Sequence, residues 1–477
     1  MVENIIELDL KEFSYHDKVL LKNIKLKVRK GEFILLSGLS GCGKTTLLRI
    51  LNGLIPDHYE GHLDGQIKIA GKDIKDYKKG ELAKVMGNVF QSPKDQFFST
   101  MAEDEVALVG ENLGMDRELL IQRVDQAFRR LGIESLKDAN IFQMSGGEMQ
   151  KVAIASSLVY DGDLLLLDEP SASLDYQSTL ELATILQKLK DTGKTIIIAE
   201  HRLFYLKDLY DRFVLLKDGN IAKEFNQGEI LEEDLPKYHL RCFDESTLRS
   251  RREGPSGKTK IKVEDGRVKI KKRVLIEDLS FSLKEGECMG VIGENGVGKT
   301  TLLKSLVGLQ KMEGKTNYGK NKRERLKHSF LLLQDADSHI FFNTVENEIL
   351  DKNRLEDKEY IEDIKNHLKA ADLWDKRLDH PQELSTGEKQ RLALIISYFE
   401  EKELILLDEP SSGLDFRRME FASNIILEMT KTRPVILITH DLELLFNTAN
   451  TVLLVGKNSY EKINTKGNEE KILRFLS

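Results

Sequence analysis

Two stretches of the chain have the residue types and spacing of a phosphate-binding loop. The first is Gly38–Thr45 and the second is Gly293–Thr300, and each fits the pattern Gly-x-x-x-x-Gly-Lys-[Ser/Thr]. In this motif the glycines let backbone N–H groups wrap a triphosphate, while the lysine meets its outer phosphates and the hydroxyl meets Mg²⁺. Two copies predict two nucleotide sites.

Other residues that could do chemistry recur in the same order in both halves. Leu164–Asp175 returns as Leu404–Asp415, and Ser145–Glu148 returns as Ser385–Glu388, at the same spacing along the chain. Repeats of this kind indicate a tandem duplication. We therefore predict one domain over residues 1–240 and a second over 261–477. The charged segment between them, which carries Gly, Pro and Ser, is the predicted linker over 241–260.

Composition excludes several classes of protein. The net charge of −7, with charges of both signs well mixed, gives no basic field, so no nucleic acid is expected as a partner. Cys42, Cys242 and Cys288 form no Cys-x-x-Cys pair, which favours a reducing compartment. The start of the chain is unlike a signal peptide, and no apolar run approaches the ~20 residues of a membrane helix. Any link to a membrane must go through a partner.

The elements around these motifs are those of an α/β protein. The strand predicted over Phe33–Ser37 runs directly into the first glycine loop, and a helix begins at Thr45. Short apolar runs, typical of buried parallel strands, precede the other motifs. They lie at Leu164–Leu167, Thr195–Ala199, Cys288–Ile292, Leu404–Leu407 and Val435–Ile438.

The ordered series of phosphate loop, glutamine, Ser-x-Gly-Glu signature, strand ending in Asp-Glu, and histidine resembles the ATP-binding cassette (ABC) ATPases, and it occurs in both halves. The resemblance covers nearly the whole chain outside the linker. It implies two tandem P-loop ABC ATPase domains. Each would have a RecA-like α/β core, a peripheral antiparallel β region and an α-helical signature subdomain.

Each element of the series has a chemical role. In the first half, Asp168 can hold Mg²⁺ together with the Thr45 hydroxyl, and Glu169 can polarise the attacking water as general base. The resemblance implies that His201 is the switch histidine, which contacts the γ-phosphate. It also implies that Gln91 reaches Mg²⁺ and reports the nucleotide state to a partner. In the second half these roles fall to Thr300, Gln334, Asp408, Glu409 and His440.

The residues expected to bind ATP and Mg²⁺ come from the two loops, the two glutamines, the two signatures and one aromatic position. They are Tyr15, Gly38, Leu39, Ser40, Gly41, Cys42, Gly43, Lys44, Thr45, Thr46, Gln91, Ser145, Gly146, Gly147, Glu148, Gly293, Glu294, Asn295, Gly296, Val297, Gly298, Lys299, Thr300, Thr301, Gln334, Ser385, Thr386, Gly387 and Glu388.

The signatures suggest why two cassettes share one chain. The Ser-x-x-Glu spacing in each signature is a capping box, so each signature should begin a helix whose free N–H groups attract anions. In the family that helix end meets the γ-phosphate held by the opposite cassette. A chain with both cassettes can form this nucleotide sandwich within itself.

The two halves are predicted to be unequal. Tyr15 resembles the adenine-stacking aromatic of the family, whereas the second half has Ile270 in its place, which should weaken nucleotide binding. The first signature has Gly146, where the second has Thr386. If that position needs a positive φ, the threonine costs roughly 1–2 kcal/mol. Both halves keep the glutamate and the histidine, so we predict two hydrolytically competent but unequal sites.

The segments Gln91–Val106 and Gln334–Ile349 are aromatic and acidic, and they resemble the ATPases of energy-coupling factor (ECF) importers. That resemblance implies membrane subunits docking near Gln91 to Glu105 and Gln334 to Glu348, a membrane substrate-binding subunit in the same complex, and a place at the cytoplasmic face of the membrane. The alternative for the aromatics is that they fill the core of the helical subdomain. They are Phe97, Phe98, Phe341 and Phe342.

Two other functions remain open at this point. One is the ATPase of another ABC transporter class. The other is a soluble tandem-cassette ATPase of the ribosome, which the short segment between the halves disfavours because those proteins carry a long charged arm there. An ATPase subunit does not touch the cargo, so the sequence does not identify the transported substrate.

Overall fold

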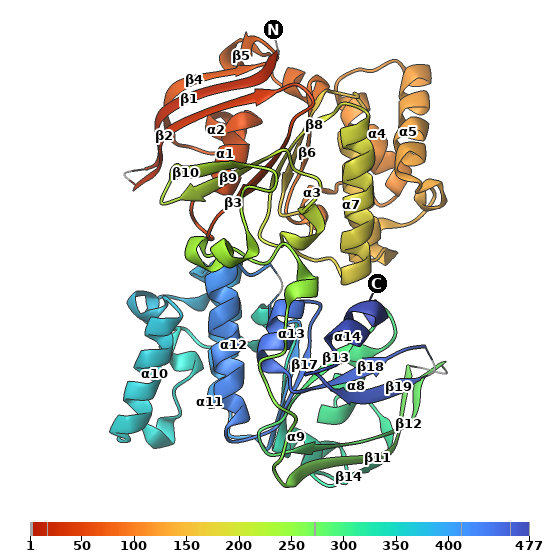
Figure 1. Ribbon diagram of the computed structural model, residues 1–477, viewed down its shortest axis with the longest axis vertical. Coiled ribbons are helices and arrows are strands. Elements are labelled where there is room, and N and C mark those ends of the chain that lie inside the picture. The colour runs from red at the N-terminus through yellow and green to blue at the C-terminus, as the bar shows by residue number, and fades with distance from the viewer. Residues whose placement is uncertain (1–2, 17, 271–272, 412, 458, 477) are drawn as a thin grey trace. The chain divides into compact units, whose positions relative to one another are not determined.

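The computed structural model describes residues 3–16, 18–270, 273–411, 413–457 and 459–476. The chain forms two compact units, Met1–Asp244 and Glu245–Ser477, called here the first and the second unit. Each unit has a mainly parallel core sheet, a smaller antiparallel sheet and a group of helices (Figure 1). The α/β fold class with two tandem domains is confirmed.

The core sheet of the first unit consists of short strands that are almost entirely apolar. Strands such as Phe33–Ser37 and Leu164–Asp168 are buried at every residue, as expected where helices cover both faces of a parallel sheet. The strand order is β10-β9-β3-β8-β7-β6, and only β10 runs antiparallel to its neighbour. The strands are β3 (Phe33–Ser37), β6 (Met86–Val89), β7 (Leu164–Asp168), β8 (Thr195–Ala199), β9 (Arg212–Lys217) and β10 (Asn220–Asn226).

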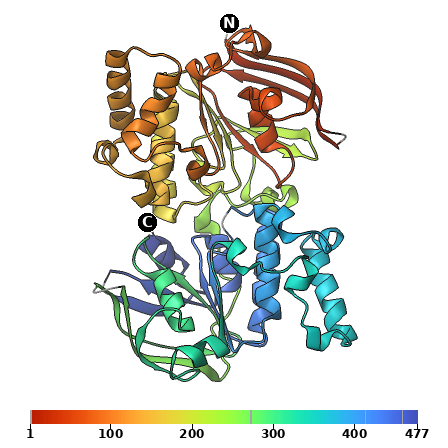
Figure 2. The same cartoon turned by 180° about the vertical axis from the view of Figure 1, so that it is seen from behind.

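The antiparallel sheet of the first unit has the order β2-β1-β4-β5. Its strands are β1 (Asn4–Tyr15), β2 (Lys18–Arg29), β4 (His62–Ile69) and β5 (Lys72–Asp73). The helices of this unit are α1 (Lys44–Leu51), α2 (Leu54–Asp57), α3 (Pro93–Gln96), α4 (Ala102–Asn112), α5 (Arg117–Leu131), α6 (Gly146–Ser157) and α7 (Tyr176–Asp191). Within this unit the antiparallel sheet lies on one side of the core sheet and α4 and α5 lie on the other (Figures 1 and 2).

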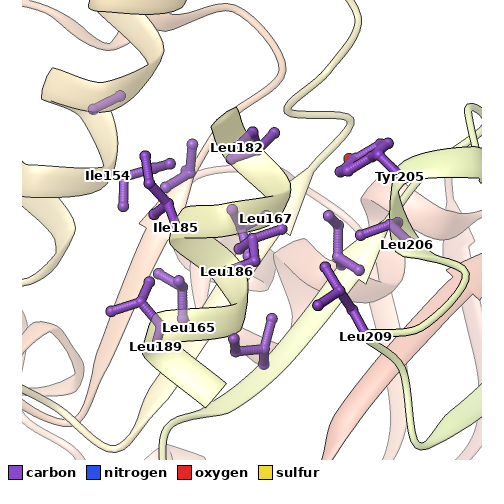
Figure 3. Packing of buried hydrophobic residues seen from close by; sticks show 14 of the residues in the cluster. Ile154, Leu165, Leu167, Leu182, Ile185, Leu186, Leu189, Tyr205, Leu206 and Leu209 are labelled. Atoms are coloured by element: carbon purple, nitrogen blue, oxygen red, sulfur yellow. The ribbon is translucent and has the colours of Figure 1, made fainter. Parts of the chain in front are cut away.

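Packing around α7 shows how the core fixes the strand ends. Its buried face includes Leu182, Ile185, Leu186 and Leu189. These side chains share one apolar cluster with Leu165 and Leu167 of β7 and with Tyr205, Leu206 and Leu209 (Figure 3). The segment that follows β8 is thereby anchored beside the strand that carries Asp168.

The second unit repeats this plan with a smaller antiparallel sheet, β12-β11-β14. Its core sheet has the order β15-β16-β17-β13-β18-β19, with only β19 antiparallel to its neighbour. The strands are β11 (Thr259–Ile270), β12 (Arg273–Lys284), β13 (Cys288–Ile292), β14 (Met312–Thr316), β15 (Ser329–Leu332), β16 (Leu404–Asp408), β17 (Val435–Ile438), β18 (Thr451–Val455) and β19 (Tyr460–Asn464).

The helices of the second unit differ from those of the first at several places. The position of α4 is taken by a short 3₁₀ turn, Glu346–Glu348. The α-helices are α8 (Lys299–Val307), α9 (Lys322–His328), α10 (Lys358–Ala370), α11 (Thr386–Phe399), α12 (Phe416–Thr430), α13 (Leu442–Thr448) and α14 (Glu469–Leu476). Over the described ranges, none of the chain's helices combines the length and the apolar character needed to cross a membrane.

Candidate nucleotide sites

Both phosphate loops have backbone conformations and close contacts that require glycine. A Cβ on Gly38 would lie 2.1 Å from the Leu216 carbonyl oxygen, and one on Gly293 would lie 2.3 Å from that of Val455. Gly43, which precedes α1, has a φ of 104°, and Gly298, which precedes α8, has a φ of 110°. Each loop therefore connects a core strand to the N-terminus of a helix, where free N–H groups attract phosphate.

The lysine of each loop is buried and holds its own loop in shape. Lys44 Nζ donates to the carbonyl oxygens of Gly38 at 3.0 Å and Leu39 at 3.2 Å. Lys299 Nζ makes the equivalent bonds to Gly293 at 2.7 Å and Glu294 at 3.0 Å. Each ammonium group therefore lies against the loop that carries it, and phosphate binding by these lysines stays a prediction.

A carboxylate and a hydroxyl meet beside the first loop. Thr45 Oγ1 donates to Asp168 Oδ1 at 3.2 Å. Burial, and then the negative charge of Glu169, raise the pKa of Asp168 to about 6. Burial likewise raises the pKa of Asp408, which is hydrogen-bonded to Thr300. Buried carboxylate oxygens beside a threonine hydroxyl fit Mg²⁺, which binds oxygen ligands.

The structure brings the predicted base, switch histidine and glutamine of the first unit together. Gln91 Nε2 donates to Glu169 Oε2 at 2.8 Å, and His201 Nε2 lies 3.3 Å from Glu169 Oε1. His201 Nε2 also lies 3.2 Å from Lys44 Nζ and 3.5 Å from Ser40 Oγ. The predicted base and the predicted switch histidine therefore lie side by side, next to the lysine of the phosphate loop.

The second unit brings fewer of these groups together. His440 Nε2 lies 3.4 Å from Glu409 Oε1, much as in the first unit. Glu169 and Glu409 share a positive φ, of 44° and 51° respectively, and each donates its N–H to the next core strand. Among the described residues, however, Gln334 makes no hydrogen bond to Glu409. In this respect the second site differs from the first, where Gln91 is hydrogen-bonded to the predicted base Glu169.

Both signatures begin helices through the predicted capping box. Ser145 Oγ accepts the N–H of Glu148 at 3.3 Å, and Glu148 Oε2 accepts the N–H of Ser145 at 2.8 Å. Ser385 and Glu388 form the same pair at 3.4 and 2.9 Å. The helix starts are confirmed, at the N-termini of α6 and α11.

The strain expected at Thr386 is not present. Gly146 is not among the residues with positive φ, and neither is Thr386, because each is the first residue of its helix. A Cβ on Gly146 would lie 3.1 Å from the Ser173 carbonyl oxygen. In the second unit the residue corresponding to Ser173 is Gly413, with a φ of 68°. The difference at the signature is therefore one of local packing and not of backbone strain.

The aromatic position differs between the units as the sequence indicated. The Tyr15 ring meets the Phe13 ring edge to face, with centroids 4.8 Å apart, and its buried hydroxyl has no hydrogen-bond partner among the described residues. The hairpin formed by β1 and β2 borders the phosphate loop, since Leu21 of β2 is the nearest side chain to Gly43. Ile270 ends β11 and is 41% exposed. Adenine stacking by Tyr15 remains a prediction.

A cavity of about 350 Å³ opens beside Thr45, Asp168 and Gln91. Its outer wall includes Arg49, whose guanidinium lies 4.2 Å from the ring centre of Tyr59. Sequence reasoning missed this wall. Arg49 lies one helical turn beyond Thr45, a spacing that could have revealed it, but no sequence signal marks Tyr59.

Most of the aromatic side chains that follow the two glutamines are exposed. Phe98 is 85% exposed, Phe341 77% and Phe342 52%, whereas Phe97 packs against the core. The core-filling alternative is thus wrong for three of the four. Phe142 is also 81% exposed, and its segment pairs with that of Phe98 through the bond from Ile141 N–H to the Thr100 carbonyl. Leu378 is exposed in the corresponding segment of the second unit.

Comparisons with known proteins agree with this geometry. The sequence profile of a family described as ABC transporter matches residues 21–172 and 276–412. A Treponema denticola protein, provisionally named an ABC transporter ATP-binding protein, is 36% identical over 467 residues, covering 94% of this chain and 95% of the relative. A Methanosarcina mazei protein with the same provisional name is 32% identical, covering 93% of this chain and 85% of the relative.

A solved structure with both units is also similar. It is a complex of the archaeal ribosomal stalk protein aP1 with the archaeal ribosome recycling factor aABCE1. The match has a TM-score of 0.69 and 22% identity, and covers 98% of this chain and 91% of that chain. At this level of identity the likeness concerns the fold alone.

Proposed function

Since the chain belongs to the ABC transporter family of ATP-binding proteins, we propose that it is the ATP-hydrolysing subunit of a prokaryotic ECF-type importer for a vitamin or a metal ion. The observation that carries the proposal is an exposed apolar surface, repeated in both cassettes, next to the glutamine that follows the phosphate loop. We call it the apolar edge. It consists of Phe98 and Phe142 in the first cassette and Phe341, Phe342 and Leu378 in the second.

The apolar edge has the same backbone support in both cassettes. Glu105 Oε2 accepts the N–H groups of Phe98 at 2.9 Å and Ser99 at 2.7 Å. In the second cassette, Glu348 Oε1 accepts those of Phe341 at 2.8 Å and Phe342 at 2.6 Å. Both glutamates are buried, so each loop is held in a shape that turns its phenylalanines to solvent. Exposed aromatic groups of this kind mark a surface that a partner covers.

The apolar edge is connected to the chemistry through a short segment. Phe98 lies seven residues after Gln91, which is hydrogen-bonded to Glu169. Phe90, just before Gln91, donates its N–H to the Gln96 side chain at 3.2 Å. A partner that moves this segment would therefore move a group in contact with the proposed base. We propose membrane subunits as that partner, docking near Gln91 to Glu105 and Gln334 to Glu348.

In this proposal each cassette supplies its own phosphate loop, general base and switch histidine. In the first cassette, Lys44 and the loop N–H groups hold the outer phosphates, and Glu169 accepts a proton from the water that attacks the γ-phosphorus. The bond to the bridging oxygen breaks, releasing ADP and phosphate. His201, beside Glu169, orients the γ-phosphate. Thr45, Asp168 and Gln91 would hold Mg²⁺, which would neutralise phosphate charge.

The capped starts of α6 and α11 present the N–H groups of a first helical turn, which attract anions. We propose that each binds the γ-phosphate held by the other cassette, so that two ATP molecules close the pair within one chain. Closure and reopening would then drive the membrane subunits from the cytoplasmic face.

A pull-down from native cells tests the proposal. A tagged Glu169→Gln/Glu409→Gln chain should retain ATP and co-purify with a multi-helix membrane protein from washed membranes. The same chain with Phe98→Ser, Phe341→Ser and Phe342→Ser should lose that protein. A matched control, Ile121→Ser/Leu355→Ser, changes exposed apolar residues outside the edge and should retain it. Recovery with ribosomes and without a membrane protein would overturn the importer proposal in favour of the ribosome-associated ATPase.

A further inference from the structure

We propose that Glu200 is a positioning residue for ATP hydrolysis in the first cassette, where its buried carboxylate ties the switch histidine His201 to the segment that follows Glu169. Glu200 comes directly after β8 and directly before His201. Its residue is only 2% exposed, although a carboxylate is among the most costly groups to bury. The inference goes beyond the proposed transport function, since it concerns the hydrolysis step alone.

One carboxylate oxygen of Glu200 fixes the backbone of the histidine. Glu200 Oε1 accepts the N–H of His201 at 2.7 Å and that of Arg202 at 3.2 Å. On its other side, the backbone of Glu200 is fixed to β3, because its carbonyl accepts from Ser37 Oγ at 2.6 Å. The histidine backbone is thereby set relative to the strand that enters the phosphate loop.

The other oxygen reaches the segment after the proposed base. Glu200 Oε2 accepts the Ser171 hydroxyl at 2.7 Å, the Ser171 N–H at 3.3 Å and the Tyr205 hydroxyl at 2.8 Å. Arg202 strengthens the connection, because its guanidinium donates to the carbonyls of Ser171 at 3.3 Å and Leu174 at 3.0 Å. Ser171 is two residues beyond Glu169, so the Glu200 carboxylate is bonded both to the backbone of His201 and to the segment that follows the proposed base.

These donors account for the buried charge. Hydrogen bonds to an ionised carboxylate are about twice as strong as neutral ones, and five of them converge on Glu200. Burial and the charge of Glu200 hold the pKa of Tyr205 well above its usual value, so its hydroxyl stays a donor. Tyr205 itself is packed in the apolar cluster beneath α7 (Figure 3).

The second cassette supports its histidine in another way. Thr439 occupies the position of Glu200, and its hydroxyl accepts the Asp441 N–H at 3.0 Å and lies 3.3 Å from Ser411 Oγ. The N–H of His440 donates to Glu409 Oε2 at 3.3 Å. There the base itself takes part in holding the histidine backbone. In the first cassette Glu200 does so, and the equivalent oxygen of Glu169 accepts from Gln91.

The test is Glu200→Thr, which installs the residue of the second cassette, made in two backgrounds. With Glu409→Gln, where the first cassette supplies the remaining turnover, kcat of the purified full chain should fall about ten- to hundredfold, as for loss of hydrogen bonds to a charged group. The KM for ATP should change less than about threefold, because the hydrogen bonds of the Glu200 carboxylate go to Ser171, His201, Arg202 and Tyr205 and not to the phosphate loop. In the Glu169→Gln background, Glu200→Thr should change kcat by less than about twofold relative to Glu169→Gln alone. The first site has already lost its base there, so the remaining turnover comes from the second cassette.

The two backgrounds separate positioning from folding, because a purely structural defect would lower turnover in both. The proposal is overturned if Glu200→Thr leaves kcat unchanged in the Glu409→Gln background. It is also overturned if Glu200→Thr lowers kcat equally in both backgrounds. Two milder variants cover the case in which Glu200→Thr does not fold. Ser171→Ala removes the 2.7 Å hydrogen bond from the Ser171 hydroxyl to Glu200, which weakens the connection between Glu200 and the segment after the proposed base, and should lower kcat in the Glu409→Gln background. Tyr205→Phe removes one donor to Glu200 but leaves the bonds from Ser171 in place, and should lower kcat less. A larger decrease in kcat for Tyr205→Phe than for Ser171→Ala contradicts the proposal.

Discussion

The two cassettes hold their switch histidines with different side chains. In the first, Glu200 accepts the N–H of His201, whereas in the second Glu409 accepts that of His440. Gln91 is hydrogen-bonded to the first base, but Gln334 does not reach the second within the described chain. Matching motifs therefore do not make identical sites, because residues outside the motifs decide which side chains are hydrogen-bonded to the histidine and to the base.

Differences between the cassettes also come in pairs. The first has a small residue in its signature, Gly146, and a larger one, Ser173, in the segment that a Cβ there would contact. The second has Thr386 and Gly413 at the same places. The contact at Gly146 is with the Ser173 carbonyl oxygen, which every residue type carries, so the pair differs through its backbone: Gly413 has a φ of 68°, and Ser173 has no positive φ. Each cassette should therefore tolerate its own pair better than a mixture of the two.

The largest expected effect tests whether both sites turn over. Replacing a general base costs about 10²–10⁴-fold at its own site. Glu169→Gln and Glu409→Gln should therefore each remove part of the steady ATPase activity, while the double variant loses at least about 100-fold. The measurement is phosphate release by the purified chain. If Glu169→Gln left turnover unchanged while Glu409→Gln abolished it, the comparison would become one of a working site with an inert one.

A smaller effect is expected from exchanging the paired residues. Gly146→Thr places a Cβ about 3.1 Å from the Ser173 carbonyl and should lower the free energy of unfolding of the first cassette by about 1–3 kcal/mol. Adding Ser173→Gly leaves this carbonyl in place but lets the backbone at position 173 move it, as the positive φ of Gly413 indicates, and should recover part of that loss. Scanning calorimetry on both variants gives the result, with Thr386→Gly as the control in the second cassette. Equal stability of the single and double variants would show that the two differences are unrelated.

Exchanging the aromatic position should alter nucleotide binding by about one order of magnitude. Base stacking is worth about 1–3 kcal/mol, so Tyr15→Ile should weaken ATP binding at the first phosphate loop about tenfold or somewhat less, since isoleucine keeps apolar contact. Ile270→Tyr should strengthen binding at the second. Titration with ATP of chains carrying Lys44→Ala or Lys299→Ala, which leave one loop functional, separates the two sites. No change in either titration would remove Tyr15 from the nucleotide site.

The smallest effect concerns pH. His339 Nε2 accepts the N–H of Leu333 at 2.9 Å, a place taken by the Gln96 side chain in the first cassette. Burial lowers the pKa of His339 below its ordinary value of 6.5. The folded state therefore binds this proton less readily than the unfolded state does. Its contribution to stability is present above about pH 6.5 and is lost as the pH falls through the lower, folded-state pKa.

His339→Gln should flatten this pH dependence in the second cassette, with a difference of no more than the ~1 kcal/mol of one hydrogen bond. The chain's one tryptophan, Trp374, lies in the second unit, so its fluorescence during unfolding reports that cassette. Gln96→His should introduce the same dependence into the first cassette, observed by calorimetry. Parallel pH curves for the parent and His339→Gln would contradict this assignment.

Much of the site could be predicted because its residues act from fixed positions in short motifs. The glycines of the phosphate loops, the Ser-x-x-Glu capping boxes and the apolar strands ending in Asp-Glu all depend on neighbours within a few residues. Such local geometry is encoded by residue type and spacing. The condition for strain at Thr386, a positive φ, is not met, because Thr386 is the first residue of its helix and has helical backbone angles.

The sequence by itself determined that this chain has two α/β nucleotide-binding units, where their loops and helix starts lie, and that they differ at Tyr15 and Gly146. Only the tertiary structure decided which side chains support them. Glu200 meets Ser171 across two neighbouring core strands, and three of the four aromatics after the glutamines turn to solvent because a buried glutamate fixes their loop. These contacts join residues that are distant along the chain or set by the path of a loop, and neither follows from spacing alone.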